Sequence, residues 1–166
     1  MTPIISIVGK SNSGKTTLIE KLLHVFVARG LRVATVKHDS HGFDVDHEGK
    51  DTWRHREAGA AAVAIISPKV LFLTRNVDEA LELETVRQKY LSEDYDFILT
   101  EGFKRSHWPK IEVHRRARSD ELICTPEQDN LIAVASDQSW DLSVPTFDLN
   151  DSNAMADFII KFVEVP

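Results

Sequence analysis

The chain has 166 residues, of which 42% are hydrophobic and 28% are charged. This length and composition are typical of one globular domain, and they exclude a disordered linker or a membrane-embedded chain. The net charge of −6 argues against nonspecific binding to nucleic acid, which requires a surplus of basic side chains. The charge is unevenly divided, since residues 1–118 sum to +3 and residues 119–166 sum to −9.

Cysteine content and apolar runs indicate the compartment. Cys124 is the single cysteine, so the chain cannot form an internal disulfide, and a reducing cytoplasm is expected. The first eight residues lack the basic start of a signal peptide, and no apolar run reaches the roughly 18 residues of a transmembrane helix. We therefore predict a cytoplasmic protein that does not associate with membranes.

Predicted strands and helices alternate along the chain. The apolar run at 4–8 predicts a buried strand, and apolar residues at 3.6-residue spacing predict a helix over 16–29. Similar patterns predict helices over 51–58, 78–91 and 153–163, and strands over 31–36, 62–66, 70–74, 97–100, 111–114, 131–135 and 144–147. We expect the strand over 111–114 to lie at a sheet edge. The alternation predicts an α/β fold with a doubly wound, mostly parallel sheet, a short antiparallel edge extension and one domain over residues 1–166.

Residues 9–16 match the pattern G-x-x-x-x-G-K-[ST] between a predicted strand and a predicted helix, the context of a phosphate-binding P-loop. The backbone N–H groups of such a loop and the helix N-terminus together bind phosphate oxygens. Lys15 is expected to reach the β- and γ-phosphates, and Thr16 to offer its hydroxyl to Mg²⁺. The predicted phosphate-binding residues are Gly9, Lys10, Ser11, Asn12, Ser13, Gly14, Lys15, Thr16 and Thr17.

A carboxylate ligand for the same Mg²⁺ is predicted at the end of a buried strand. Glu101 follows the apolar run at 97–100, at the carboxyl end where open α/β sheets bind ligands. Asp51, at the start of a predicted helix, is either a helix N-cap or a second carboxylate on the ion. The predicted magnesium residues are therefore Thr16, Asp51 and Glu101.

Two charged segments lie outside these motifs. Residues 37–57 hold 14 ionisable side chains, and three of them, His38, His41 and His47, either bind a transition metal or belong to a loop that orders around nucleotide. Residues 104–118 carry six lysines and arginines, a stretch too local to indicate nucleic acid. We predict instead a surface for an anionic ligand or an acidic partner, formed by Lys37, His38, Lys104 and Arg105.

Together these motifs resemble one family, the molybdopterin-guanine dinucleotide biosynthesis adapter proteins, or MobB. The resemblance covers about residues 4–162 and rests on the order and spacing of short motifs. These are Gly-Lys-Ser-Asn-Ser-Gly-Lys-Thr-Thr at 9–17, Val-Lys-His-Asp at 36–39, Asp-Val-Asp at 44–46, Gly-Lys-Asp-Thr at 49–52, Ala-Gly-Ala at 58–60, Glu-Gly-Phe-Lys at 101–104 and Ala-Val-Ala-Ser-Asp at 133–137.

The resemblance implies a three-layer P-loop NTPase fold and a GTP- and Mg²⁺-binding homodimer with weak GTPase activity. It also implies a partner guanylyltransferase that joins GMP to molybdopterin, and leaves open whether molybdopterin itself touches this chain. By similarity to the MinD-like class, Lys10 either reaches phosphates across a dimer interface or is a solvated loop lysine. A P-loop small-molecule kinase and a metallochaperone-like GTPase are the alternative functions, and no general base is predicted.

The base of the nucleotide is not fixed by these motifs. The Asn-Lys-x-Asp signature by which common GTPases recognise guanine is absent. Ser136 and Asp137, after the predicted strand 131–135, are the best substitute, because a carboxylate there accepts hydrogen bonds from guanine N1–H and N2–H₂. The alternative is a simple turn at the end of the strand.

Overall fold

The computed structural model describes residues 1–39, 42–43, 45–91 and 94–164. These residues form two compact units, one of residues 1–38 and 87–166 and the other of residues 39–86. The division falls inside helix α3 (Leu83–Tyr90), whereas the sequence predicts one domain over residues 1–166. The predicted P-loop lies wholly in the first unit.

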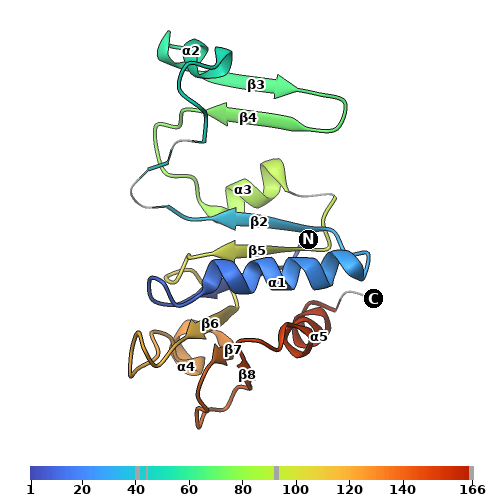
Figure 1. Ribbon diagram of the computed structural model, residues 1–166, viewed down its shortest axis with the longest axis vertical. Coiled ribbons are helices and arrows are strands. Elements are labelled where there is room, and N and C mark those ends of the chain that lie inside the picture. Colours follow the sequence, from blue (N-terminus) through green and yellow to red (C-terminus); the bar gives the residue numbers. More distant parts are fainter. Residues whose placement is uncertain (40–41, 44, 92–93, 165–166) are drawn as a thin grey trace. The chain divides into compact units, whose positions relative to one another are not determined.

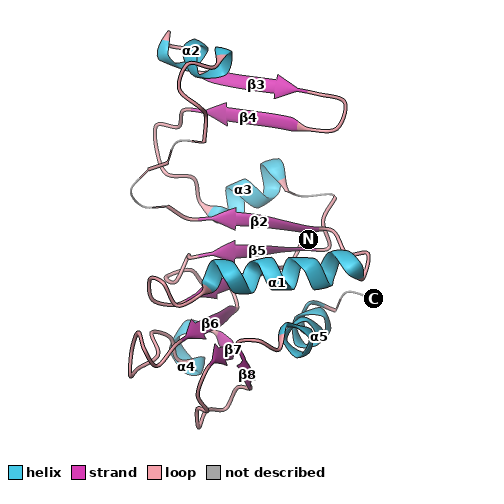
Figure 2. Cartoon of the chain, in the orientation of Figure 1, coloured by secondary structure: helices cyan, strands magenta, loops and turns pink. Residues whose placement is uncertain are grey.

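A six-stranded sheet forms the centre of the first unit (Figures 1 and 2). Its strands follow the order β2 (Val33–Lys37), β5 (Phe97–Glu101), β1 (Ile4–Val8), β6 (Lys110–His114), β7 (Leu131–Ser136) and β8 (Thr146–Asp148). Every neighbouring pair is parallel, so the carboxyl ends of all six strands meet at one edge. The predicted α/β fold with a mostly parallel sheet is confirmed.

Helix α1 (Lys15–Ala28) covers one face of this sheet. Its buried residues Leu18, Leu22 and Phe26 recur at helical spacing and pack against the apolar side chains of the strands. The ring of Phe26 meets the ring of Phe97 edge-on, with 5.0 Å between their centroids. This packing fixes the N-terminal end of α1 directly after β1, where a phosphate-binding loop requires it.

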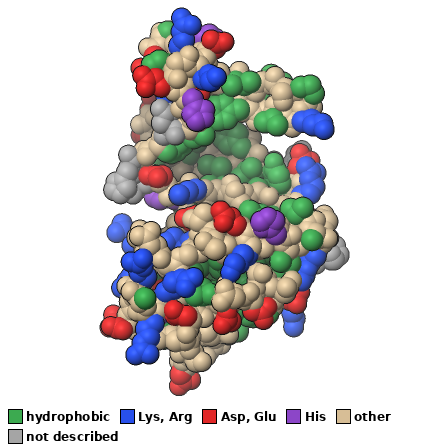
Figure 3. All heavy atoms as spheres, viewed as in Figure 1, with side chains coloured by type: hydrophobic (Ala, Val, Ile, Leu, Met, Phe, Trp, Pro, Cys, Tyr) green, Lys and Arg blue, Asp and Glu red, His purple; other side chains and the backbone are tan. Residues whose placement is uncertain are grey.

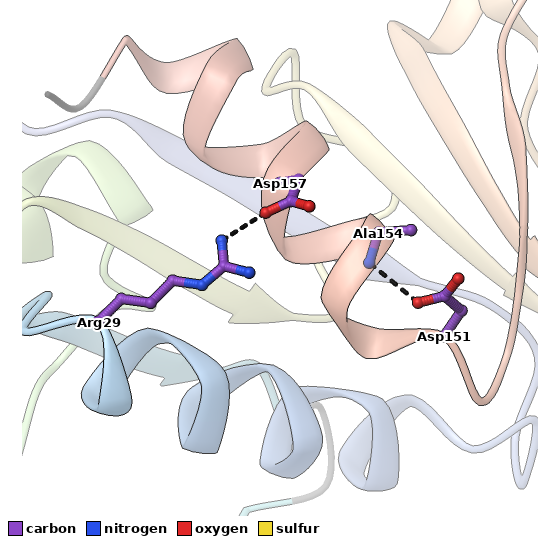
Figure 4. Close-up of polar contacts among 4 residues, drawn as sticks. All are labelled: Arg29, Asp151, Ala154 and Asp157. Atoms are coloured by element: carbon purple, nitrogen blue, oxygen red, sulfur yellow. Dashed lines mark hydrogen bonds and ion pairs between the residues drawn. The ribbon is translucent and has the colours of Figure 1, made fainter.

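Helix α5 (Ser152–Val163) lies beside α1 on the same face. The carboxylate of Asp151 accepts a hydrogen bond from the backbone N–H of Ala154 at 3.0 Å and so caps the start of α5 (Figure 4). One turn later, Asp157 pairs with Arg29 just beyond the end of α1, at 2.5 Å (Figure 4). The closing helix is thus joined to α1 by an ion pair as well as by apolar contacts.

The segment after β6 covers the opposite face. Val8, Leu131 and Val134 form a small buried cluster there with Cys124. Helix α4 (Pro126–Asp129), capped by the Thr125 hydroxyl, escapes prediction because four residues are too few to show a 3.6-residue pattern. Burial raises the pKa of the Cys124 thiol to about 12, so the thiol stays protonated at neutral pH.

Strand β6 is an interior strand, and its predicted position at a sheet edge is wrong. The prediction failed because three of its five residues, Lys110, Glu112 and His114, are ionisable, although all three are buried. Each has polar partners. The Lys110 ammonium group donates to the carbonyls of residues 106, 108 and 129, and the Glu112 carboxylate accepts from the amides of residues 123 and 124. His114 contacts the hydroxyl of residue 136 and the carbonyl of residue 119.

The second unit contains helix α2 (Asp51–Glu57) and an antiparallel pair, β3 (Ala62–Ile66) and β4 (Leu71–Arg75). The antiparallel pair is confirmed, as a separate two-stranded sheet. Helix α3 begins at Leu83 rather than at the predicted cap Asp78, because Leu83 is the first residue of that segment to be buried. None of the helices formed by the described residues is long and apolar enough to cross a membrane.

The buried Lys110 provides a test of the interior of β6. In a Lys110→Met variant, the aliphatic stem is kept but three backbone carbonyls lose their shared donor. We expect the free energy of unfolding in urea to fall by about 3 kcal/mol, since unsatisfied buried acceptors cost about 1–3 kcal/mol each and neighbouring groups relax in part. Lys69→Met, at an exposed turn, is the control and should change stability by less than about 0.5 kcal/mol. Equal stability of the two variants would contradict this role of Lys110.

Candidate functional site

The loop between β1 and α1 has the backbone conformation that the P-loop motif predicts. Gly9 has a φ of 143°, and a Cβ atom there would lie 2.3 Å from the carbonyl oxygen of Val113. Gly14 has a φ of 103° and forms the N-cap of α1, without a hydrogen bond from any described capping side chain. Only glycine fits both positions, and the first N–H groups of α1 stay available to an anion.

The side chain of Lys15 lies across this loop. Its ammonium group donates to the carbonyl oxygens of Gly9 at 3.0 Å and Lys10 at 2.8 Å. Burial lowers the pKa of Lys15, nearby Glu101 raises it and nearby Lys37 lowers it. A phosphate group placed beside this lysine would favour its charged form, which makes the position suited to an anion.

Thr16 and Glu101, two of the predicted magnesium residues, lie together. The Thr16 hydroxyl donates to Glu101 Oε2 at 3.0 Å. The contact follows from the sheet, because β1 and β5 are parallel neighbours in which Ile7 pairs with Glu101, so both strands end beside the loop. A hydroxyl and a carboxylate are hard oxygen ligands of the kind that Mg²⁺ prefers, and their arrangement fits this ion.

A hollow of about 470 Å³ lies over these groups. It is lined by Ser11, Asn12, Gly14, Lys15, Thr16, Thr17, Lys37 and Glu101. The lining is mainly polar, with two lysines and one carboxylate, and all six of its P-loop residues belong to the predicted phosphate-binding set. Lys10, also predicted, instead donates to the Ser119 hydroxyl at 2.6 Å within the same chain. The hollow has the polarity and charge expected of a polyphosphate site.

The surface predicted to bind an anionic ligand or an acidic partner begins at the same sheet edge. Lys37 ends β2 beside Glu101 in the parallel register, and the backbone N–H of His38 donates to the Glu101 carbonyl at 3.0 Å. The ring of His38 packs against the ring of Phe103 in a tilted arrangement, with 4.9 Å between their centroids, so that it contacts the turn after β5. Lys104 and Arg105 lie exposed on that turn. On the face shown in Figure 3, basic and acidic side chains are interspersed.

The two residues predicted to recognise guanine have different surroundings. The Ser136 hydroxyl is buried against His114 and the indole N–H of Trp140, at 3.1 and 3.3 Å. Asp137 is exposed, and one of its carboxylate oxygens accepts a hydrogen bond from the backbone N–H of Arg116 at 2.9 Å. Asp137 therefore keeps oxygen lone pairs for a ligand, whereas Ser136 serves the interior.

The remaining candidates belong to the second unit or to its start. Asp51 is the first residue of α2, where its charge favours the helix N-terminus. Asp46 accepts hydrogen bonds from the His47 amide and the Thr52 hydroxyl, at 2.9 and 3.1 Å. His41 of the histidine loop lies outside the described residues. Within the part of the chain that the structure describes, no three histidine, cysteine, aspartate or glutamate side chains gather as a metal site.

One contact at this site was not predicted. The Nε atom of Arg115, the residue directly after β6, donates to the carbonyl oxygen of Ser13 in the P-loop at 3.0 Å. The sequence predicts only a surface for an anionic ligand or an acidic partner near the basic stretch that contains Arg115. The available signal was its position at the carboxyl end of a strand, which becomes informative only once β6 is known to neighbour β1.

A family model decides the relationship of this chain to known proteins. Residues 4–137 match the model described as "Molybdopterin guanine dinucleotide synthesis protein B", or MobB. The chain belongs to the MobB family. It shares 37% identity over 95% of its length with a Haemophilus influenzae protein and 36% over 99% with an Escherichia coli protein, covering 87% and 95% of those chains. Both relatives are named molybdopterin-guanine dinucleotide biosynthesis adapter protein.

Solved MobB structures have the same fold. A crystal structure of molybdopterin-guanine biosynthesis protein B aligns with a TM-score of 0.78 at 34% identity, and the match covers 98% of this chain and 99% of the other. The crystal structure of Bacillus subtilis MobB aligns with a TM-score of 0.78 at 30% identity, covering 96% of each chain. The predicted P-loop NTPase fold is thereby confirmed over nearly the whole chain.

Proposed function

We propose that this MobB protein is a GTP- and Mg²⁺-binding adapter in the biosynthesis of molybdopterin guanine dinucleotide. The observation that carries the nucleotide part is the hydrogen bond between Thr16 and Glu101, at 3.0 Å, in a hollow that also holds Lys15. The adapter role is supported by the names of the two relatives aligned along almost the entire chain. The adapter would then have a nucleotide-bound and a nucleotide-free state, which its partner, a guanylyltransferase, could bind with different affinities.

Different residues of the hollow would bind the phosphates and the magnesium ion. The N–H groups at the start of α1 and the ammonium group of Lys15 would hold the phosphates, and Lys37 adds a second positive charge. Thr16 and Glu101 would hold Mg²⁺, which when bound neutralises phosphate charge. Asp51, the first residue of α2, is a further candidate ligand. It is proposed on its sequence position and on the family resemblance.

The lining of the hollow also supports weak hydrolysis. Glu101 is its single described carboxylate, and holding Mg²⁺ would occupy it. The other described lining groups are lysine ammonium groups, which have no lone pair to accept a proton, and hydroxyls, an amide and backbone, which are too weakly basic to take a proton from water. A slow GTPase that mainly serves as a binding protein fits this arrangement.

Guanine recognition would fall to Asp137. Its carboxylate is exposed at the carboxyl end of β7, and the Arg116 amide holds one oxygen in place at 2.9 Å. A carboxylate oriented in this way accepts the N1–H and N2–H₂ donors of guanine, which adenine lacks on the corresponding edge. GTP is for this reason the nucleotide that we propose.

A homodimer is supported by the second unit. Its β3–β4 pair is a two-stranded sheet, an arrangement that is at best marginally stable in water without further packing. Large apolar side chains on and beside the pair are exposed, namely Ile65, Ile66, Val70, Leu71 and Leu73. We propose that a second copy of the chain covers these side chains, because a self-complementary apolar patch is how twofold dimers form.

The magnesium assignment predicts the effect of Glu101→Gln. This change keeps the size of the side chain but removes its charge, so we expect GTP affinity with Mg²⁺ to fall at least tenfold in a calorimetric titration, while affinity in EDTA stays within about twofold. Glu20→Gln, at an exposed position on α1, is the matched control and should bind as the unchanged protein does. Equal losses with and without Mg²⁺ would contradict an ion-binding role for Glu101.

The guanine assignment predicts a change of preference in Asp137→Asn. The amide presents one donor where guanine also presents donors, so we expect GTP affinity to fall at least tenfold and ATP affinity to change by less than threefold. Competition of each nucleotide against a fluorescent analogue measures the ratio. Asp141→Asn, at an exposed position a few residues later, is the control. An unchanged GTP/ATP ratio in Asp137→Asn would overturn this assignment.

The adapter and dimer proposals are tested in one measurement. The chain is used to capture a purified guanylyltransferase, and the mass of the eluted complex is determined by light scattering. We expect a complex containing two copies of this 18.8 kDa chain, retained more strongly with GTP and Mg²⁺ than without them. Leu71→Ser with Leu73→Ser should yield single copies of the chain. Absence of capture would refute the adapter role, and single copies of the unchanged chain would refute the dimer.

A further inference from the structure

Arg115 contacts the P-loop from outside the hollow. Its Nε atom donates to the Ser13 carbonyl at 3.0 Å, and its guanidinium group lies 3.5 Å from the point where a Cβ atom of Gly14 would be. Gly14 lines the hollow, and Arg115 is not among the residues that do. The arginine is therefore placed to act on the loop rather than directly on a ligand in the hollow.

The hydrogen bond fixes the peptide unit between Ser13 and Gly14. In a trans peptide the C=O and N–H bonds point in opposite directions, and all described peptide bonds are trans. Because the Ser13 carbonyl points to Arg115, the Gly14 N–H points away from Arg115. Glycine has more backbone freedom than any other residue, so a peptide unit that ends at Gly14 gains from an outside restraint.

Arg115 is itself held in place by a tight turn. The backbone N–H groups of Arg118 and Ser119 donate to the Arg115 carbonyl at 2.8 and 3.2 Å. The next residue, Arg116, donates its backbone N–H to the Asp137 carboxylate at 2.9 Å. One turn thus carries both the contact to the phosphate loop and the contact to the proposed guanine residue.

We propose that Arg115 is a positioning residue, which orients the Gly14 N–H toward the phosphates of the bound nucleotide by holding the Ser13 carbonyl. This inference rests on the proposed nucleotide-binding function. A positioning role differs from direct contact with phosphate, because positioning requires the single Nε–H donor of Arg115 and not its charge. The two possibilities can be separated with side chains that keep one property and lose the other.

Three variants make this separation. Arg115→Gln places an uncharged N–H donor at the same chain position as Nε, Arg115→Met places a methyl group there, and Arg115→Lys keeps the charge but places a methylene there. We expect the dissociation constant for GTP with Mg²⁺ to rise about tenfold, or about 1.4 kcal/mol, in the Met and Lys variants. The Gln variant should stay within threefold of the unchanged protein, and so should the control Arg118→Met, an exposed arginine of the same turn.

The orientation of the amide is measured directly by NMR. Selective ¹⁵N-glycine labelling gives signals from only seven glycines, so the Gly14 amide can be identified by substitution. Adding GTP and Mg²⁺ should change the ¹H chemical shift of the Gly14 amide. We expect this change to be retained in Arg115→Gln and reduced by at least half in Arg115→Met. Thermal unfolding without nucleotide shows whether each variant is folded. The Met and Lys variants both lack the Nε–H donor, so either one can replace the other in the comparison if one of them does not fold.

The outcomes are distinct. Failure of the unchanged protein to bind GTP overturns the proposed function. If the unchanged protein binds and Arg115→Met binds equally well, the positioning role alone is overturned. It is also overturned if Arg115→Lys restores binding and Arg115→Gln does not, since the charge would then be acting on the nucleotide.

Discussion

The parallel pairing of β1 with β5 is the constraint on which the site depends. Because Ile7 pairs with Glu101, the two strands end at the same level, and the loop that leaves β1 reaches the carboxylate that ends β5. The hydrogen bond from Thr16 to Glu101 joins residues 85 positions apart in the sequence. The contact depends on this register, because a shift of one position would turn the Glu101 side chain to the other face of the sheet, away from Thr16.

The neighbouring strand β6 adds a second constraint of a different kind. Most buried strands are filled with apolar side chains, whereas β6 buries a lysine, a glutamate and a histidine. Most of their partners are backbone groups of the turn before the strand and of the segment between β6 and β7, so the strand holds these two connections in place. Directional hydrogen bonds specify the path of a loop more narrowly than apolar contacts, which tolerate small displacements.

Much of this architecture could be predicted from the sequence, for identifiable reasons. The P-loop is a local motif, and the helix that follows it shows its period through Leu18, Leu22 and Phe26. Glu101 could be placed because a buried apolar run ends just before it. By contrast, the position of β6 depended on non-local partners for its charged residues, and the start of α3 depended on the burial of Leu83. The contact of Arg115 with Ser13 required knowledge of strand order, which local patterns do not contain.

The buried thiol of Cys124 has a practical consequence for the study of this protein. Its high pKa leaves almost no thiolate at neutral pH, and its side chain is shielded beneath the segment that covers the second face of the sheet. A reporter dye or spin label could then be attached to a cysteine introduced at a chosen surface position, with the native thiol left in place. Such a label on the P-loop would report on its conformation without any change to the core of the fold.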